Sequence, residues 1–388
     1  MYNGAEPFAS FLKKYFSVNK KFGSRDRKII SNLCYCYFRL GKANFEMKKQ
    51  DRILAGLFLC SNESNEILAA LKPEWNLNVK SGVKKKYSII NDPHQTVGKE
   101  YRILNVFPWV NELSDGIEHE KFCKSFLVQP DLFIRLRPGK ENLVKNKLIK
   151  AGIKFLEISE SALSLPNTTK LKDVIQIDEE AVIQDRSSQQ VGEFIRNEVE
   201  MFDKNVSVWD CCAASGGKSI MAYDINPDIQ LTVSDVREGI LENLKKRFLI
   251  AGIRKYKSVI IDLTKNNIQH PIAIGSMLNN QQLIIIADVP CSGSGTWSRT
   301  PEQLYYFDEK RIYEYASLQK KIISNVIPHL KPGGSLIYIT CSVFKKENEE
   351  VAAFAESEFT LKLVKQEMIK GYDKKADSMF VALLRKDL

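Results

Sequence analysis

The strongest constraint on the fold is a series of five short apolar segments that begins after residue 200. These segments span residues 206–210, 231–235, 258–262, 283–288 and 335–340. Longer stretches with helical periodicity separate them; the stretch 309–330 ends at Lys331-Pro332-Gly333-Gly334. Short strands that alternate with helices build a parallel sheet covered on both faces. The pattern therefore predicts a doubly wound α/β fold.

An open sheet of this kind binds its ligand in a crevice at the carboxyl ends of its strands. The segment 206–210 runs into a loop of small residues, 211–219, and three later segments end in Asp235, Asp262 and Asp288. The loop alone is equally compatible with a tight turn, because it has neither the GxGxxG nor the P-loop spacing. Asp235, however, can accept hydrogen bonds from both hydroxyls of a ribose. Three carboxylates suit a cationic or neutral ligand, which favours S-adenosylmethionine.

Two cysteines follow strands of the same predicted sheet, Cys291 after 283–288 and Cys341 after 335–340. A free cysteine is usually a packing residue, and we assign Cys211 and Cys212 to packing. A thiolate, however, is a strong nucleophile, and nucleophilic addition is what a pyrimidine ring needs before its C5 can attack a methyl donor. Two thiols at the edge expected to hold the cofactor favour that chemistry.

The positive charge is concentrated near the start of the chain. Lysine and arginine number 57 against 47 acids, and the first sixty residues hold twelve of these bases against four acids. A second basic run, Lys80 with Lys84–Lys86, lies among Trp75, Tyr87 and Tyr101. Any single run can be a solvated face, but cations mixed with aromatic rings suit phosphates and unstacked bases. The distribution therefore favours a polyanionic partner.

Composition excludes several classes of protein. A chain of 388 residues with 44% apolar and 27% charged residues is neither disordered nor collagen-like. Its apolar runs are far shorter than the roughly 20 residues that span a bilayer, and the N-terminus lacks a signal segment. Eight scattered cysteines without a Cys-x-x-Cys pair, together with four histidines, favour free thiols over disulfides or a metal site. We expect a cytoplasmic monomer without a membrane partner or a metal.

The chain divides by pattern into three regions. Residues 1–100 show helical spacing, as in Phe8, Phe11 and Leu12, with a loop or linker over 72–95. Residues 101–200 predict a small α/β module with a strand at 131–138 and a helix at 141–151. Residues 201–388 hold the predicted doubly wound sheet.

Three motifs, in this order, resemble those of the Sun (NOL/NOP/Sun) family of RNA cytosine-5 methyltransferases. They are Cys-Cys-Ala-Ala-Ser-Gly-Gly-Lys at 211–218, Asp-Val-Pro-Cys-Ser-Gly-Ser-Gly at 288–295, and Thr340-Cys341-Ser342 followed by Glu347-Asn348-Glu349. The similarity extends through 184–189 and 131–138, and reaches 377–386. Residues 24–41 resemble the NusB-like region of small-subunit rRNA methyltransferases in the family. The resemblance implies a Rossmann-like catalytic domain, an RRM-like RNA-binding module before it, and a helical RNA-binding region first.

The resemblance also implies roles for individual residues. Cys341 would add to C6 of a flipped cytosine, Asp288 would hydrogen-bond the ring near N3, and Cys291 would assist removal of the C5 proton. Lys218 would support the active site. The S-adenosylmethionine pocket would be lined by Cys212, Ala213, Ala214, Ser215, Gly216, Gly217, Lys218, Asp235, Asp262 and Asp288. The implied substrate is 16S ribosomal RNA, with large-subunit rRNA and tRNA as alternatives.

Two features depart from the family pattern. Ser215 stands where the family usually has proline, and the region before residue 100 is shorter than a full NusB-like domain. Two rival functions stay open. A DNA cytosine-5 methyltransferase would use a Pro-Cys nucleophile without a second Thr-Cys thiol, and a non-catalytic RNA-binding assembly factor could keep the same fold.

Overall fold

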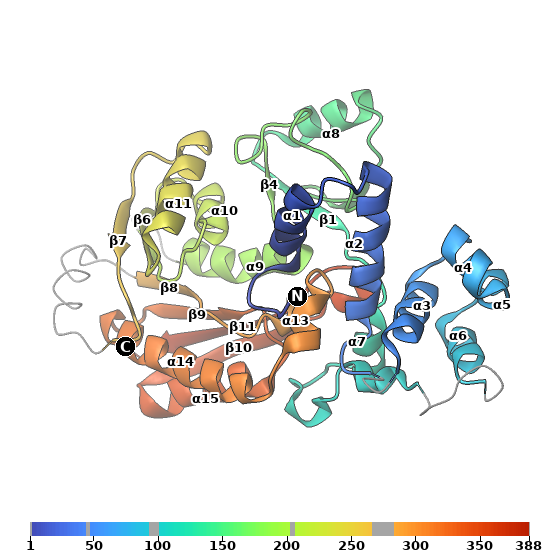
Figure 1. Cartoon of the computed structure of the whole chain (residues 1–388). Helices are drawn as coiled ribbons and strands as arrows, with labels where there is room; N and C mark the ends of the chain where they lie inside the picture. Colours follow the sequence, from blue (N-terminus) through green and yellow to red (C-terminus); the bar gives the residue numbers. More distant parts are fainter. Residues whose placement is uncertain (1, 44–46, 93–100, 202–205, 266–282, 388) are drawn as a thin grey trace. The chain divides into compact units, whose positions relative to one another are not determined.

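The computed structural model describes residues 2–43, 47–92, 101–201, 206–265 and 283–387 (Figure 1). The chain forms two compact units. The first consists of residues 1–113, 117–130 and 296–309, and the second consists of residues 114–116, 131–295 and 310–388. Among the described residues, no helix is both long enough and apolar enough to cross a membrane.

A seven-stranded sheet forms the centre of the second unit, in the order β10-β11-β9-β8-β5-β6-β7. The strands are β5 (Ser207–Asp210), β6 (Gln230–Asp235), β7 (Lys257–Ile260), β8 (Leu283–Asp288), β9 (Ser335–Thr340), β10 (Leu361–Ile369) and β11 (Met379–Lys386). The first five of these run parallel, which confirms the five predicted strands and the doubly wound fold. The antiparallel hairpin β10–β11, which extends the sheet beyond β9, was not predicted.

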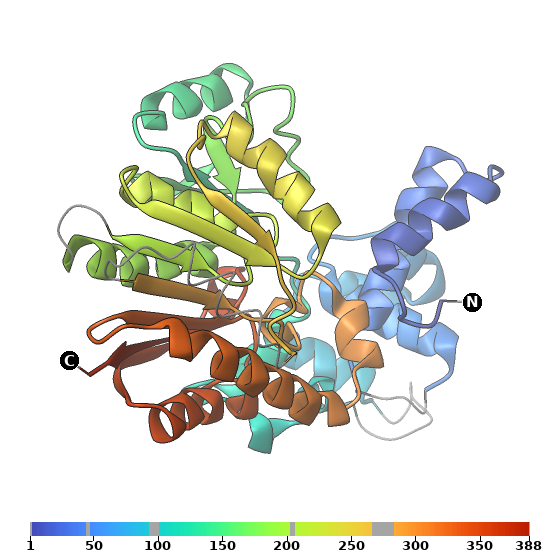
Figure 2. The same cartoon turned by 90° about the vertical axis from the view of Figure 1, so that its left-hand side faces the viewer.

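Helices cover both faces of this sheet (Figures 1 and 2). One face carries α9 (Arg186–Met201), α10 (Gly217–Ile225) and α11 (Glu238–Ile250), and the other carries α14 (Lys310–Val326) and α15 (Glu349–Glu358). Strand β8 shows why two cores form. Ile284 and Ile286 pack into the first core, and Ile285 and Ala287 pack into the second. Because side chains alternate along a strand, a continuously apolar strand is buried on both faces.

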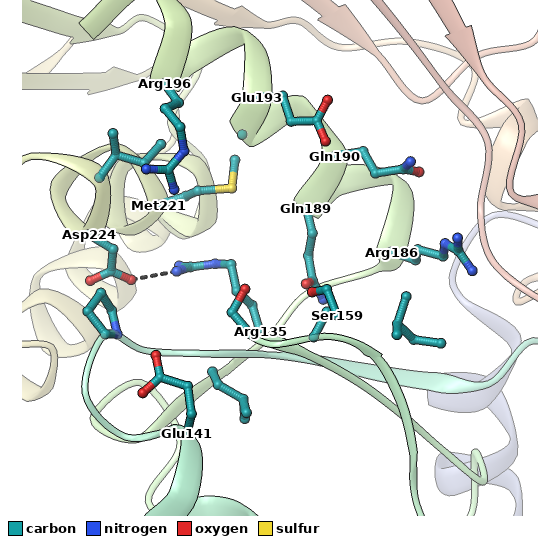
Figure 3. Close-up of a pocket in the computed structure, with 17 residues that line it drawn as sticks. Arg135, Glu141, Ser159, Arg186, Gln189, Gln190, Glu193, Arg196, Met221 and Asp224 are labelled. Atoms are coloured by element: carbon teal, nitrogen blue, oxygen red, sulfur yellow. Dashed lines mark hydrogen bonds and ion pairs between the residues drawn. The ribbon is translucent and has the colours of Figure 1, made fainter. Parts of the chain in front are cut away.

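The second unit also contains a four-stranded antiparallel sheet in the order β2-β3-β1-β4. Its elements are β1 (Leu132–Leu136), α8 (Glu141–Lys150), β2 (Leu156–Ser159), β3 (Ala162–Leu165) and β4 (Ala181–Ile183). Arg135 and Arg137 of this sheet both pair with Asp224 of α10, at 2.6 and 2.7 Å. Figure 3 shows the Arg135–Asp224 pair at a cavity of about 520 Å³. The predicted strand and helix are confirmed, and buried ion pairs tie the module to the large sheet.

The first unit is helical, as expected. It contains α1 (Phe8–Val18), α2 (Ser24–Arg39), α3 (Lys49–Cys60), α4 (Glu66–Leu71), α5 (Pro73–Leu77), α6 (Val83–Ile90), η1 (Ile103–Val106), η2 (Val110–Glu112), α7 (His119–Ser125) and α13 (Pro301–Tyr306). Helix α13 comes from far along the sequence but belongs here: Glu302 Oε1 accepts a hydrogen bond from the Phe8 N–H at 3.1 Å. The hydroxyls of Tyr37 and Tyr305 lie 3.0 Å apart.

The prediction of a loop or linker over residues 72–95 is wrong for the described part of this range, which contains α5 and α6. The aromatic residues explain the difference, because Trp75 and Tyr101 are each only 2% exposed and pack as core residues. Lys86 is also buried and donates to the carbonyl oxygens of Phe58 and Ser61. The exposed cations of this run are therefore Lys80, Lys84 and Lys85.

The two compact units differ from the three expected regions 1–100, 101–200 and 201–388. The helical unit continues to residue 130 and recruits residues 296–309, whereas the small α/β module joins the large sheet in one unit. Local periodicity shows where helices and strands form. It does not show which of them share a core, because that depends on contacts between distant segments.

Candidate active site

A cavity of about 490 Å³ lies at the carboxyl ends of the parallel strands, where the sequence predicts the ligand crevice. Every parallel strand is followed by residues that line it. Asp235 and Asp288 are the last residues of β6 and β8. The other lining residues are Cys211, Cys212 and Ala214 after β5, Val236 and Arg237 after β6, Ile261, Asp262, Leu263 and Thr264 after β7, Val289, Pro290 and Cys291 after β8, Cys341 after β9, and Leu318 and Ile322 of α14. Three predicted carboxylates and two predicted thiols therefore meet at one cavity.

The loop after β5 depends on a glycine. Gly216 has a φ of +83°, and a Cβ placed there would lie 2.7 Å from Phe248. Only glycine adopts this backbone conformation without strain and also fits the space. The turn exposes Cys212 and Ala214 to the cavity, while Ala213 is buried. Gly216 and Gly217 shape the turn but lie outside the cavity lining.

Ser215 also lies outside the cavity lining and is held from another direction. Its carbonyl oxygen and its Oγ accept hydrogen bonds from Arg247 Nη1 at 2.7 and 3.0 Å. The same guanidinium pairs with Asp178 of the α/β module at 2.6 Å. A serine here thus contributes a side-chain acceptor that proline lacks, and links the loop to the module through Arg247.

Asp235 and Asp262 are carboxylates held in their charged form. Asp235 accepts hydrogen bonds from the Ala214 N–H at 3.0 Å and from Arg237 Nε at 2.9 Å. Burial opposes ionisation of Asp235, but the bonds from Arg237 outweigh it and lower its pKa. Asp262 accepts from the Thr264 hydroxyl at 2.6 Å, and the bonds from Thr264 lower its pKa. Arg237 was not predicted as a site residue from the sequence. It lies two residues after Asp235, which was predicted.

Asp288 connects the cavity to Lys218, which lies outside the lining. Lys218 Nζ donates to Asp288 Oδ2 at 2.6 Å. Burial by itself lowers the pKa of Lys218, but the attraction of Asp288 outweighs this effect and leaves the pKa raised. Asp210 is buried nearby, accepts from the Ser219 hydroxyl at 2.6 Å, and has its pKa raised by burial to about 7. Lys218 therefore stays charged and orients the Asp288 carboxylate.

The two predicted thiols lie side by side. Cys291 Sγ and Cys341 Sγ are 3.2 Å apart, and both line the cavity. The hydrogen bond to Cys341 and burial hold the pKa of Cys291 well above its ordinary value. Cys291 therefore keeps its proton at neutral pH, and its Sγ lies within hydrogen-bond distance of the Cys341 sulfur. The two sulfurs are therefore close enough to share a proton, and a cysteine acts as a nucleophile in its thiolate form.

A buried carboxylate behind the thiols had no role assigned from the sequence. Glu347 is fully buried, and its oxygens contact the loops that carry both cysteines. Glu347 belongs to the motif Glu347-Asn348-Glu349, which the sequence analysis noted. Its position close to Cys341 in the sequence did not indicate that its side chain also contacts the loop of Cys291.

The cavity has the chemistry that S-adenosylmethionine requires. Aliphatic side chains from the segments after β6 and β7 and from α14 form an apolar wall on which an adenine ring can lie, made of Val236, Ile261, Leu263, Leu318 and Ile322. Asp235 supplies charged acceptors beside the exposed Ala214 turn, in the place expected for a ribose. The carboxylate of Asp288 attracts a cationic centre. Within the described ranges, no group of three or more His, Cys, Asp or Glu side chains is arranged to hold a metal ion.

The chain is similar to known methyltransferases. Residues 199–385 match a family model described as 16S rRNA methyltransferase RsmB/F. The ribosomal RNA small subunit methyltransferase B of Proteus mirabilis is 29% identical over 209 residues, covering 53% of this chain and 46% of that protein. A probable ribosomal RNA small subunit methyltransferase B of Synechocystis is 26% identical over 277 residues, covering 68% of this chain and 58% of that protein. The chain thus spans about half the length of the curated relatives it matches.

Solved structures share the fold at low sequence identity. The crystal structure of PH0851 superposes with a TM-score of 0.68 and 19% identity, covering 96% of this chain and 93% of that one. The structure of NSun6 from Pyrococcus horikoshii with SFG has a TM-score of 0.55 and 16% identity, covering 69% of this chain and 94% of that one. Residues 199–385, just under half of the chain, are therefore similar to the RsmB/F methyltransferases that this family model describes.

Proposed function

We propose that the protein is an S-adenosylmethionine-dependent RNA cytosine-5 methyltransferase with 16S ribosomal RNA as its leading substrate. The observation that carries this proposal is the pair of thiols, 3.2 Å apart, in the same cavity as Asp288 and Asp235. A methyltransferase that acts on a nitrogen or oxygen atom does not need a nucleophile. A pyrimidine carbon does, because its ring must first be activated by addition.

S-adenosylmethionine supplies the methyl group when it is bound. Asp235 would hold its ribose, Cys212 and Ala214 would contact it through the turn after β5, and Asp262 would lie at the β7 side of the same cavity. The ionised state of Asp235 and Asp262 suits hydroxyl and amine donors. Asp288 lies between this end of the cavity and the thiols, so its carboxylate would face both the cofactor and the base.

Cys341 starts the reaction on the RNA. Its thiolate forms a bond to C6 of the cytosine, and the electron pair of the C5–C6 double bond moves into the ring. Asp288, which accepts a hydrogen bond from Lys218 at 2.6 Å, would take a proton from that ammonium group and donate it toward N3, which neutralises the charge that thiolate addition places in the ring. C5 is then nucleophilic and takes the methyl group.

Release of the product requires a base. The C5 proton must be removed so that the double bond forms again while the bond between C6 and the Cys341 sulfur breaks. Cys291 lies beside that sulfur and would take part in this step. Its raised pKa means that the thiol must first lose its proton, and that the thiolate, once formed, is a strong base.

The RNA must present a single-stranded or extruded base, because C6 is inaccessible inside a helical stack. Exposed lysine and arginine side chains of the helical unit would bind the phosphates of the RNA. They include Lys13, Lys14, Lys20, Lys21, Arg25, Lys28, Lys84 and Lys85. This proposal places the enzyme in the cytoplasm as a monomer and keeps the helical region and the α/β module as RNA-binding parts.

Nucleoside mass spectrometry would test the function directly. Purified protein and S-adenosylmethionine are incubated with RNA from cells that lack the gene, and 5-methylcytidine is measured separately in 16S rRNA, large-subunit rRNA and tRNA. We expect a gain in 16S rRNA. A gain of 5-methylcytidine in another RNA fraction would identify that RNA as the substrate instead. If the protein neither methylates RNA nor binds the cofactor in calorimetry, an RNA-binding assembly factor would be favoured.

A further inference from the structure

The two thiols come from loops after different strands, so something must hold the loops together. Glu347 lies in a short helix, η5 (Lys345–Glu347), and is fully buried. Its Oε2 accepts a hydrogen bond at 2.8 Å from the N–H of Ser292, the residue after Cys291. Its Oε1 accepts a hydrogen bond at 2.9 Å from the hydroxyl of Ser342, the residue after Cys341. One carboxylate therefore contacts the immediate neighbour of each thiol.

Gln319 of α14 completes the contact on the Cys291 side. Its Nε2 donates to Glu347 Oε2 and to the carbonyl oxygen of Pro290, both at 3.0 Å. Its Oε1 lies 3.2 Å from the Tyr338 hydroxyl, whose proton also reaches the Glu347 carbonyl oxygen at 2.5 Å. The two backbone groups that flank Cys291, the Pro290 carbonyl and the Ser292 N–H, thus both bond to the pair formed by Glu347 and Gln319.

The Cys341 loop has additional support that does not involve Glu347. Asn348 Nδ2 donates to the Ser342 carbonyl at 2.9 Å, and the Val343 N–H donates to Ser294 Oγ at 2.9 Å. The Gly295 N–H donates to the Cys341 carbonyl at 2.9 Å. Ser294 and Gly295 belong to the loop of Cys291, so their bonds join the two loops, whereas Asn348 supports the Cys341 loop alone. Because the Ser292 N–H beside Cys291 bonds directly to Glu347, loss of the carboxylate would disturb the segment at Cys291 first.

The site requires a group that only accepts hydrogen bonds. Three donors converge on Glu347: the Ser292 N–H, the Gln319 amide and the Ser342 hydroxyl. The Ser342 hydroxyl oxygen already accepts from the Phe344 N–H at 3.0 Å, so its own proton is directed to Glu347. A glutamine at position 347 has the same shape but would place an NH₂ group against one of these donors.

We propose that Glu347 is a positioning residue that holds Cys291 beside Cys341, and that release of the methylated RNA depends on it. The inference rests on the proposed function only for its second clause, because the position of the thiols can be measured without RNA. A displacement of about 1 Å can slow a step by about 10²-fold when two groups must meet in one geometry.

The first test measures thiol geometry alone. The full chain is treated with diamide, which takes two electrons and two protons from a pair of thiols and leaves a disulfide. Mass spectrometry of peptides then follows formation of the Cys291–Cys341 bond. We expect Glu347→Gln to form this bond at least about fivefold more slowly than the unmodified chain, since disulfide formation requires close and correctly oriented sulfurs.

A matched control uses a carboxylate of the same segment that does not contact the thiol loops. Glu350 lies on α15, is exposed, and pairs with Lys346 at 3.6 Å. Glu350→Gln should form the disulfide at the unmodified rate. Gln319→Leu removes the amide but keeps Glu347, and should slow disulfide formation less than Glu347→Gln does. Circular dichroism establishes that each variant is folded. If Glu347→Gln does not fold, the disulfide rate of Gln319→Leu is compared with that of the unmodified chain: a slower rate supports the inference, and an equal rate contradicts it.

The second test adds RNA and S-adenosylmethionine. We expect Glu347→Gln to carry out the first methyl transfer but to accumulate a protein–RNA adduct that survives denaturing electrophoresis, with multiple-turnover rates lowered by about tenfold or more. Disulfide and release rates equal to those of the unmodified chain would overturn the inference. If the unmodified chain forms no adduct and no 5-methylcytidine, the proposed function fails, and the disulfide rates still decide whether Glu347 positions Cys291.

Discussion

The two ends of the cavity hold their functional groups in different ways. At the cofactor end, Asp235 and Asp262 are ionised and receive several hydrogen bonds from residues close in sequence, such as Arg237 and Thr264. At the thiol end, Cys291 and Cys341 meet through buried contacts between distant segments, and one sulfur directly faces the other. We infer that changes at the thiol end abolish single steps, whereas changes at the cofactor end weaken binding gradually.

The largest effect should come from Cys341→Ala. This change removes the nucleophile, and no neighbouring residue replaces it because Cys291 holds its proton. We expect methyl transfer to fall by at least about 10³-fold, about 4 kcal/mol, with cofactor binding unchanged. Measuring 5-methylcytidine formation and calorimetric binding side by side tests this. Retained turnover would exclude Cys341 as the nucleophile.

Cys291→Ala should have the next largest effect, on a different step. Cys341 can still add to the base and the methyl group can still be transferred, but release should slow by about 10²-fold or more. A protein–RNA band on a denaturing gel would show the trapped adduct. A variant that turns over normally, with no slower band, would contradict the assigned role of Cys291.

The same residue predicts a pH dependence for the unmodified protein. Because the pKa of Cys291 is raised, only a small fraction is deprotonated at neutral pH, and this fraction grows about tenfold per pH unit below the pKa. Decay of a pre-formed adduct should therefore accelerate as pH rises from 7 toward 9. A flat profile would mean that Cys291 does not act as the base. The adduct of Cys291→Ala provides the control and should show little acceleration.

At the cofactor end, Asp235→Asn should weaken S-adenosylmethionine binding by about 10- to 100-fold, about 1.5–3 kcal/mol, because hydrogen bonds to a charged group are lost. Calorimetry gives the dissociation constant. At saturating cofactor the single-turnover rate should recover, which no change at the thiol end would allow. If binding is unaffected, Asp235 does not hold the cofactor.

The smallest effect should come from Ser215→Ala. The carbonyl of residue 215 would keep its bond to Arg247, and only the bond at 3.0 Å to the hydroxyl would be lost. Because Ser215 is exposed and the bond is partly solvated, we expect less than about 1 kcal/mol in cofactor binding or stability. Thermal melting with and without cofactor measures both. A large loss would show that this serine has a direct role at the cofactor site.

Prediction from the sequence succeeded where local pattern controls structure. Continuous apolar segments can be buried on both faces of a sheet, so all five parallel strands could be located, together with Asp235, Asp262 and Asp288 near their ends. The β10–β11 hairpin was missed because polar residues interrupt β10 and five of its nine residues are exposed, as expected of an edge strand. The helices at 73–90 were missed because Pro73 and Gly82 suggested a loop, while the burial of Trp75 became visible only in the folded unit.

The sequence by itself determined that three carboxylates and two thiols gather at one edge, because the carboxyl ends of parallel strands share an edge whatever the packing around them. Only the tertiary structure decided how these groups interact. The 3.2 Å between Cys291 and Cys341, the contact of Glu347 with both loops, and the link from Ser215 through Arg247 to Asp178 all join residues far apart in the chain. Such contacts follow from the packing of whole elements, which local sequence patterns do not encode.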